Sequence, residues 1–345
     1  MSALTLVKLD RNQIASIAAN AFAHLPNLTE VNLDENRVRE LRRGVFVDVP
    51  ALHTLFITRN NMSIIHDGAF EHLHNLAELE LSGNDISVLT KDTFLGLANL
   101  RKLDLGFNSV SMLGDYTFSE TPMLEDLLLE SNNIQLITEK AFTGLGNLRK
   151  LILSHNKITS LPSRVFEGVP NLFYLDLKTN FLDTLTYETM RPILHNLINT
   201  TSYFLVDVNQ FTCDCRLAWI HRLHNQTESN SIRGELESML CRFARNETEQ
   251  EDSVKVTTML PSAKGSDSDD VEYEYEYYDE LQGPSDTSRL LQIPLNELPC
   301  TQDELASEEL RQIMNVPKDS VNSIGIPRPD LYLIAVIACA VCNWI

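Results

Sequence analysis

The stretch Leu148-Arg-Lys-Leu151-Ile-Leu153-Ser-His-Asn156-Lys-Ile158 follows the pattern L-x-x-L-x-L-x-x-N-x-I, and this pattern returns every 24 residues in both directions. Three columns keep the period without a slip of register. The ladder asparagines are Asn12, Asn36, Asn60, Asn84, Asn108, Asn132, Asn156 and Asn180. The leading leucines are Leu4, Leu28, Leu52, Leu76, Leu100, Leu124, Leu148 and Leu172. The phenylalanines are Phe22, Phe46, Phe70, Phe94, Phe118, Phe142 and Phe166, with Met190 in the eighth place.

Three columns in phase over eight turns indicate a leucine-rich repeat. The leucines of the stretch are expected to point inward from a short strand, while Lys150 and Ile152 point outward. One repeat cannot bury its own apolar face, so stacked neighbours supply the core. The predicted fold is an α/β leucine-rich repeat solenoid, a horseshoe with a parallel sheet on its concave face and irregular or 3₁₀-like segments around the phenylalanines on its convex side.

Breaks in the period divide the chain. A five-residue insertion follows the eighth repeat, because the next ladder asparagine is Asn209 where the period places Phe204. Met1-Ser-Ala-Leu4 begins inside a repeat, with neither a signal peptide nor an N-terminal cap before it, so we expect the N-terminus to be truncated. The predicted parts are eight repeats over 1–195, an irregular ninth repeat over 196–212, a C-terminal cap over 213–300, a disordered acidic insertion at about 249–292, a stalk over 301–323 and an attachment signal over 324–345.

Charge and motifs limit the classes of function. The formal net charge is -20, which argues against a nucleic-acid partner and against binding to anionic lipid heads. The sequence has no nucleophile elbow, no H-E-x-x-H and no phosphate-binding loop, and its one C-x2-C pair, Cys339 and Cys342, lies in the apolar tail. We therefore expect no enzyme activity, no cofactor and no metal.

Cysteines and sequons indicate an oxidising compartment. None of the six cysteines lies in the regular repeats, and four follow them at Cys213, Cys215, Cys241 and Cys300. Such a cluster favours disulfides, with a zinc site as the alternative. Five N-x-S/T sequons support secretion, at Asn27, Asn61, Asn199, Asn225 and Asn246.

The end of the chain is apolar from Leu331 to Ile345. As a helix it would span about 22 Å, which is less than the ~30 Å hydrocarbon core of a bilayer. Small residues, a polar spacer and this tail follow the order of a GPI-attachment signal. Ser323 is the expected attachment site and Asn322 the next choice. A short transmembrane anchor is the alternative.

The acidic insertion contains tyrosines among carboxylates and no basic residue between Ser266 and Glu280. A segment of this composition is expected to be disordered. Its tyrosines resemble substrates for sulfation in the secretory pathway, and a solvated spacer is the alternative interpretation. The candidate sulfation sites are Tyr273, Tyr275, Tyr277 and Tyr278.

The segment Cys213-Asp-Cys215-Arg-Leu-Ala-Trp219 resembles the C-terminal flanking cap of extracellular leucine-rich repeat proteins. The resemblance implies disulfides Cys213–Cys241 and Cys215–Cys300, with Trp219 covering the last coil. With the repeats, the acidic insertion and the tail, the chain resembles the connectin-like extracellular leucine-rich repeat cell-adhesion proteins. This implies homophilic adhesion at the outer face of the plasma membrane and a role in neuron–muscle recognition. A ligand-binding receptor ectodomain, of an innate immune or guidance type, is the alternative function.

The concave face is the predicted site for a protein partner, which could be a second copy of the chain. Apolar side chains are expected there among polar ones, an arrangement that suits protein recognition. Scattered exposed apolar residues are also ordinary, and the convex and edge surfaces stay open as alternatives. The candidate binding residues are Phe56, Phe107, Leu128 and Ile152, with an acidic rim of Glu78, Asp126 and Glu130.

Overall fold

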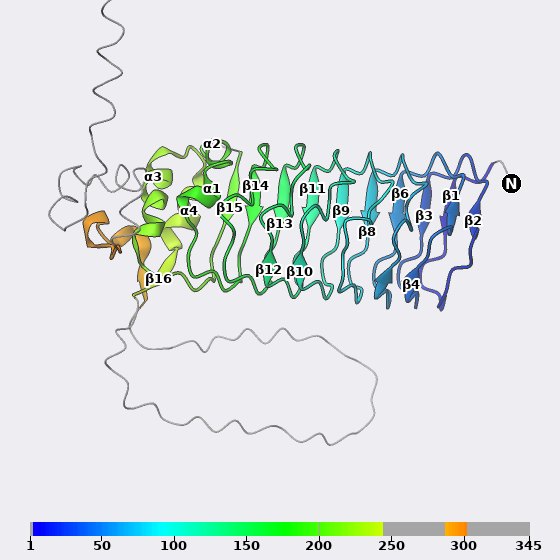
Figure 1. The fold of residues 1–345 in the computed structure, drawn as a ribbon, viewed down its shortest axis with the longest axis horizontal. Helices are drawn as coiled ribbons and strands as arrows, with labels where there is room; N and C mark the ends of the chain where they lie inside the picture. Colours follow the sequence, from blue (N-terminus) through cyan, green and yellow to red (C-terminus); the bar gives the residue numbers. More distant parts are fainter. Residues whose placement is uncertain (1–2, 200, 244–286, 302–345) are drawn as a thin grey trace, which may run out of the picture.

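The computed structural model describes residues 3–199, 201–243 and 287–301. Nine parallel strands, one from each coil, form a main sheet along the length of the solenoid in the order β1-β3-β6-β8-β9-β11-β13-β14-β15 (Figure 1). The strands are β1 (Leu6–Lys8), β3 (Glu30–Asn32), β6 (Thr54–Phe56), β8 (Glu78–Glu80), β9 (Lys102–Asp104), β11 (Asp126–Leu128), β13 (Lys150–Ile152), β14 (Tyr174–Asp176) and β15 (Tyr203–Leu205). The predicted leucine-rich repeat solenoid is confirmed.

The register follows the sequence period. Partners in neighbouring strands are 24 residues apart, as for Lys150 and Tyr174. At the last pair Tyr174 instead lies opposite Tyr203, because the five extra residues lengthen the ninth coil. Asn209 takes the ladder position of that coil and accepts a hydrogen bond from Leu182 N at 3.0 Å.

Short two-stranded sheets join neighbouring coils away from the main sheet. In Figure 1, β4, β10 and β12 lie below the row of main-sheet strands. Three of these sheets are parallel and connect successive repeats, while the fourth is antiparallel and belongs to the cap. The pairs are β2 (Phe22–Ala23) with β5 (Phe46–Val47), β4 (Glu40–Leu41) with β7 (Ile64–Ile65), β10 (Met112–Leu113) with β12 (Leu136–Ile137), and β16 (Leu240–Arg242) with β17 (Thr287–Arg289).

The core is one continuous column of inward side chains. From β3 to β14, the middle residue of each three-residue strand is buried between two half-buried ones. The phenylalanine column is buried too, and the rings of Phe94 and Phe118 stack at 5.7 Å, with Phe142 following at 6.4 Å. Stacked repeats therefore bury the faces that a single repeat leaves open.

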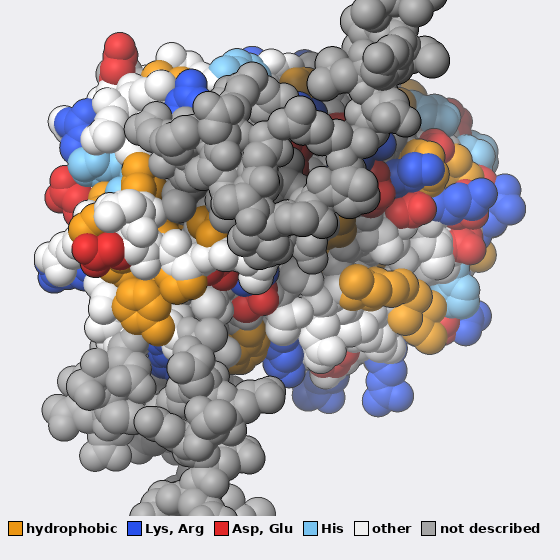
Figure 2. All heavy atoms as spheres, turned by 60° about the vertical axis from the view of Figure 1, so that its left-hand side comes forward, with side chains coloured by type: hydrophobic (Ala, Val, Ile, Leu, Met, Phe, Trp, Pro, Cys, Tyr) orange, Lys and Arg blue, Asp and Glu red, His pale blue; other side chains and the backbone are white. Residues whose placement is uncertain are grey.

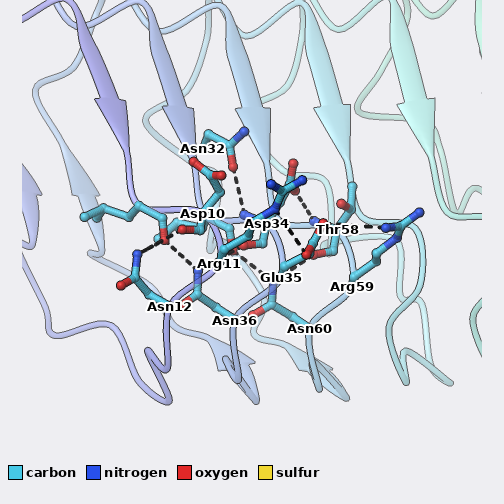
Figure 3. Close-up of polar contacts among 12 residues, drawn as sticks. Asp10, Arg11, Asn12, Asn32, Asp34, Glu35, Asn36, Thr58, Arg59 and Asn60 are labelled. Atoms are coloured by element: carbon cyan, nitrogen blue, oxygen red, sulfur yellow. Dashed lines mark hydrogen bonds and ion pairs between the residues drawn. The ribbon is translucent and has the colours of Figure 1, made fainter. Parts of the chain in front are cut away.

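The asparagine ladder satisfies backbone groups at the bend of each coil (Figure 3). The Asn36 amide donates to Leu9 O of the preceding coil at 2.8 Å and to Leu33 O of its own coil at 3.0 Å. Its Oδ1 accepts from Ile14 N at 2.9 Å. Asn12, in the first coil, is exposed and donates only to carbonyls of its own coil, at Leu9 and Asp10. A ladder asparagine therefore joins two coils only where a coil precedes it.

The convex side is irregular over most of its length, which is one of the two forms predicted. Its segments are turns, and the described residues before Cys215 contain no 3₁₀-helix. Leu73 N donates to Phe70 O, and Leu76 N donates to Leu73 O. A 3₁₀-helix needs such bonds from successive residues, whereas here they are isolated. The eighth repeat has two short helices instead, α1 (Tyr187–Met190) and α2 (Leu194–Leu197).

The cap closes the end of the solenoid with helices and two disulfides. Trp219 is buried against the last coil, where its Nε1 donates to Leu185 O at 2.7 Å and its ring packs 6.2 Å from that of Phe204. The cap elements are η1 (Cys215–Leu217), α3 (Ala218–Gln226), α4 (Asn230–Ser238), β16, β17, η2 (Leu290–Gln292) and η3 (Leu295–Glu297).

The C-terminal boundary of the predicted insertion is wrong. Residues 287–292, which the prediction placed in the disordered insertion, form β17 and η2. Strand β17 pairs antiparallel with β16, and Leu290 is buried and donates its N–H to Met239 O at 3.0 Å. This apolar anchor orders the segment, so the part of the insertion outside the described residues ends at 286.

Candidate functional site

The outward side chains of the main sheet form two columns on one face, which we call the sheet face. Each strand contributes its first and third residues to these columns. The first column is Leu6, Glu30, Thr54, Glu78, Lys102, Asp126, Lys150, Tyr174 and Tyr203. The third-residue column is Lys8, Asn32, Phe56, Glu80, Asp104, Leu128, Ile152, Asp176 and Leu205.

Lys102 is held at the middle of this face by two carboxylates. Its Nζ lies 2.9 Å from Glu78 and 2.5 Å from Glu80. Partial burial lowers the pKa of Lys102, but the hydrogen bonds and charges of Glu80 and Glu78 outweigh it, so the pKa rises well above its usual value. Burial raises the pKa of Glu80 although Lys102 opposes this effect. Lys102 is therefore already neutralised within its own chain.

An acidic group lies beside this cluster. Burial raises the pKa of Glu130, and the nearby Asp104 and Asp176 add to that effect. Glu130 Oε2 is buried without a hydrogen-bond partner among the described residues. A Cβ on Gly106 would lie 3.1 Å from the Glu130 carboxyl carbon, so glycine leaves room for this side chain. The centre of the sheet face is thus acidic.

The predicted apolar patch is only partly assembled. Leu128 and Ile152 lie opposite each other in β11 and β13, and both are half-buried. Phe56 does not join them, because Glu80 and Asp104 occupy the two strands between. Phe56 shares the outward column of Leu128 and Ile152, as predicted, but two strands separate it from them.

Phe107 lies outside the strands, in the turn before ladder Asn108. It has a left-handed backbone conformation with φ of 52°, and its N–H donates to Glu130 O at 2.9 Å. Its side chain is 56% exposed, the most exposed of the four candidate residues. Phe107 thus borders the acidic centre of the sheet face from the turn side.

Aromatic rings follow at the cap end of the sheet. Tyr174 and Tyr203 pack at 5.2 Å between ring centroids, and Lys150 Nζ lies 5.2 Å from the centroid of Tyr174. Tyr203 is exposed and was not among the predicted site residues. The 24-residue period points to residue 198 instead, so only the shifted position of Asn209 could have identified Tyr203 from the sequence.

Ion pairs also link the turns that leave the sheet. Glu35 lies between Arg11 at 3.4 Å and Arg59 at 3.5 Å, and Figure 3 shows these three side chains together with the asparagine ladder. All three are exposed, so water and salt screen these pairs strongly. Figure 2 shows acidic and basic side chains mixed over the described surface, with hydrophobic groups between them.

The structure also places the other predicted sites. Disulfides join Cys213 to Cys241 and Cys215 to Cys300, with Cα–Cα distances of 5.0 and 5.2 Å, which are the pairs that the cap resemblance implies. Four sequon asparagines are exposed: Asn27, Asn61, Asn199 and Asn225. Outside the described residues lie Asn246, Tyr273, Tyr275, Tyr277, Tyr278, Asn322 and Ser323.

Within residues 3–199, 201–243 and 287–301, no helix is both long and apolar enough to cross a bilayer. The predicted apolar tail and its attachment signal lie outside these residues.

Comparison with known proteins supports the fold. The chain is 20% identical in sequence to a chain in the structure of the Drosophila Toll–Spatzle complex, with a TM-score of 0.52 over 70% of this chain and 40% of that one. At this identity the similarity shows the fold alone.

A relative in sequence is more specific. The chain is 50% identical over 60 residues to connectin of Drosophila melanogaster. These residues are 17% of this chain and only 9% of connectin's length. The predicted resemblance to connectin-like leucine-rich repeat proteins is thereby confirmed.

The family model described as "Leucine rich repeat" matches the chain in overlapping segments from residue 2 to residue 193. These matches cover more than half of the 345 residues, and they coincide with the coils of the main sheet. The chain therefore belongs to the leucine-rich repeat family.

Proposed function

We propose that this protein acts at the cell surface in recognition and adhesion, and that its sheet face binds a protein partner. The observation that carries the proposal is the 50% identity to connectin over 60 residues. The disulfide-bonded cap supports it, because such bonds persist outside the cytosol. Exposed sequons on the solenoid fit the same compartment.

The chemistry of the sheet face points to a partner with basic groups around an apolar contact. Glu80, Asp104 and Glu130 make the centre acidic, and Lys102 is occupied by its own carboxylates. Leu128 and Ile152 supply adjacent apolar side chains beside that centre. Such complementarity raises association rates and excludes acidic partners.

Homophilic adhesion, as in neuron–muscle recognition, is part of the proposal. Two sheet faces in contact would bring Glu80, Asp104 and Glu130 of both copies together. Like charges opposed across an interface are unfavourable, and here the nearest cation is already paired. The contact between copies is therefore assigned to a surface other than the sheet face.

Attachment to the membrane is proposed to occur through a GPI anchor at Ser323, or at Asn322. The support is the order of small residues, spacer and apolar tail. Treatment of cells with a phosphatidylinositol-specific phospholipase should release the protein. Retention after complete digestion would instead indicate a membrane-spanning tail.

The sheet-face proposal is tested with cells that display the full chain. We expect them to adhere to neuronal or muscle cells, and the double variant Leu128→Glu with Ile152→Glu to lose most of this adhesion. Leu6→Glu, on the same face at its N-terminal end, is the matched control and should adhere normally. Normal adhesion by the double variant would move the site away from the sheet face. A soluble-ligand receptor would bind its ligand without making cells adhere.

A further inference from the structure

Four large apolar side chains form one exposed column on the side of the solenoid, one from each of four consecutive repeats. They are Ile64, Val88, Met112 and Leu136, with 51%, 69%, 50% and 54% of their surfaces exposed. We call this column the apolar stripe. Each member lies four residues after a ladder asparagine, and Met112 pairs with Leu136 in the β10–β12 sheet. Neighbours in a sheet, such as Met112 and Leu136, are about 4.8 Å apart. Backbone bonds from Asp85 N to Met62 O and from Ser109 N to Ile86 O hold the coil of Val88 between those of Ile64 and Met112.

The stripe lies on a different surface from the sheet face. Figure 1 places β10 and β12 below the main-sheet strands, and Figure 2 shows hydrophobic side chains exposed along that lower side. The four side chains of the stripe are more exposed than Leu128 and Ile152, which are half-buried. A contiguous row of exposed apolar groups is uncommon on a protein that stays alone in water.

The residues directly before and after each member of the stripe carry no charge. The residues that immediately precede its four members are Ser63, Ser87, Ser111 and Gln135, and all four are exposed. Glu40, at the equivalent position in the repeat before, is paired with Arg42 at 2.5 Å and His66 at 2.9 Å. Ser160 takes the equivalent position in the repeat after. The stripe is thus bounded at both ends, and exposed charges begin three positions away, at Asp85 on one side of Val88 and at Lys91 on the other.

The net charge of the whole chain limits which partner such a surface can bind. Two copies of this chain each carry a formal net charge of -20, so they repel unless the surfaces that meet are neutral. The sheet face is acidic at its centre, whereas the stripe offers apolar groups and hydroxyls. We infer that the apolar stripe is the contact between two copies of this chain, packed antiparallel. This inference rests on the proposed adhesion function and names the surface that its homophilic part uses.

The order of residues in the stripe suits an antiparallel pair. A two-fold axis across its middle places Val88 opposite Met112 of the second copy, and Ile64 opposite Leu136. The exposed charged column three residues further on is Asp67, Lys91, Asp115 and Glu139; the same axis brings Lys91 opposite Asp115 near its middle and the acidic Asp67 opposite Glu139 at its ends. Two copies related in this way have their caps at opposite ends, as required for chains held at their C-terminal ends by two facing membranes.

The size of the stripe predicts a weak contact. Four side chains cover less than the ~800 Å² per partner that a standard stable interface buries. A weak contact repeated over many copies on two membranes still holds cells together, because each bond raises the effective concentration of the next. Asn61 lies three residues before Ile64, and a glycan there would border that end of the stripe. The inference therefore depends most on Val88, Met112 and Leu136.

Aggregation of suspension cells that display the full chain tests this inference. We expect Val88→Glu and Met112→Glu each to reduce aggregation at least about tenfold, because each buries a charge against apolar groups. Both side chains are at least half exposed, so the fold tolerates the changes. Met123→Glu is the matched control, since Met123 is 45% exposed and lies outside the stripe, and it should aggregate like the wild type.

A mixing experiment tests the antiparallel arrangement. Val88→Glu cells mixed with Met112→Lys cells should aggregate again, because the introduced charges then face each other with opposite signs. This rescue would also show that both variants are folded. The inference is overturned if wild-type cells do not aggregate, if Val88→Glu cells aggregate fully, or if mixing restores nothing. Adhesion to neuronal or muscle cells in any of these cases would leave the proposed function standing, and its absence would remove that function too.

Discussion

On the sheet face, most charged side chains are half-buried and the centre is acidic, whereas the members of the apolar stripe are uncharged and more exposed. Lys102 lies between Glu78 and Glu80 on the first surface, while serines border Val88 and Met112 on the second. Both surfaces belong to the same coils and rest on the same core. The difference shows that the 24-residue framework determines where an outward side chain lies and leaves its chemistry free.

A change in the shared core should damage both surfaces at once and have the largest effect. Phe118 is fully buried and stacks between Phe94 and Phe142. Phe118→Ala should lower the free energy of unfolding by about 3–5 kcal/mol, since it leaves a cavity that the stacked coils cannot fill. Chemical denaturation would measure this loss, and Phe107→Ala, at an exposed ring, should change the stability little.

The asparagine ladder connects the two surfaces, so its loss should come next in size. Asn132 lies between β11 and β12, donates to Leu105 O at 2.9 Å and accepts from Val110 N at 3.0 Å. Asn132→Ala should cost about 1–3 kcal/mol of stability, because these buried backbone groups lose their partner. Asn12→Ala removes only exposed bonds within its own coil. An equal loss of denaturation midpoint for both variants would contradict the role of the ladder.

A change in ionic strength should distinguish binding through the sheet face from binding through the apolar stripe without any mutation. Binding of a basic partner to the sheet face should weaken several-fold as ionic strength rises from about 0.15 to 0.5 M. The reason is that the Debye length is about 8 Å at 0.15 M and becomes shorter as salt is added. Aggregation through the uncharged stripe should persist over the same range. Adhesion assays with heterologous partner cells and with identical cells, run in parallel, measure both. Equal salt sensitivity would argue that one surface serves both contacts.

The smallest expected effect concerns pH. Burial raises the pKa of Glu130 above its ordinary value of 4.5, so the folded protein holds that proton more tightly than the unfolded chain. The resulting stability is present below pH 4.5 and is lost as pH rises through the raised pKa. Glu130→Gln should therefore be more stable than the wild type at pH 7, with the gain absent below about pH 4. Glu30→Gln, on the same face, is the control; the same gain there would exclude burial of Glu130 as the cause.

The periodic part of the fold was predictable because each coil repeats one set of inward positions. The leucines, asparagines and phenylalanines occupy the core and ladder as their spacing indicates. The helices α1 and α2 were missed because they lie at the end of the eighth repeat, where Met190 replaces the phenylalanine and the period ends. Residues 287–292 were misplaced because the acidic composition before them hides the apolar anchor at Leu290.

The candidate site was less predictable than the fold. Leu128 and Ile152 meet as expected. Phe56 is separated from them by the two strands that carry Glu80 and Asp104 in the same column. The register in the sequence already contained that separation, and the search for apolar groups overlooked it. The apolar stripe was also visible in the sequence, as four large apolar residues each four places after a ladder asparagine.

The sequence by itself determined the coil, its period and the inward or outward direction of each side chain, because a repeat that must stack on itself allows only one alternation. The tertiary structure decided how exposed each outward residue is. In the main sheet, neighbouring coils partly cover Leu128 and Ile152. On the side of the solenoid, neighbouring coils leave at least half of Val88 and Met112 exposed. It also decided which charges are free, since Lys102 meets Glu78 and Glu80 only when its coil is stacked on the coil before it.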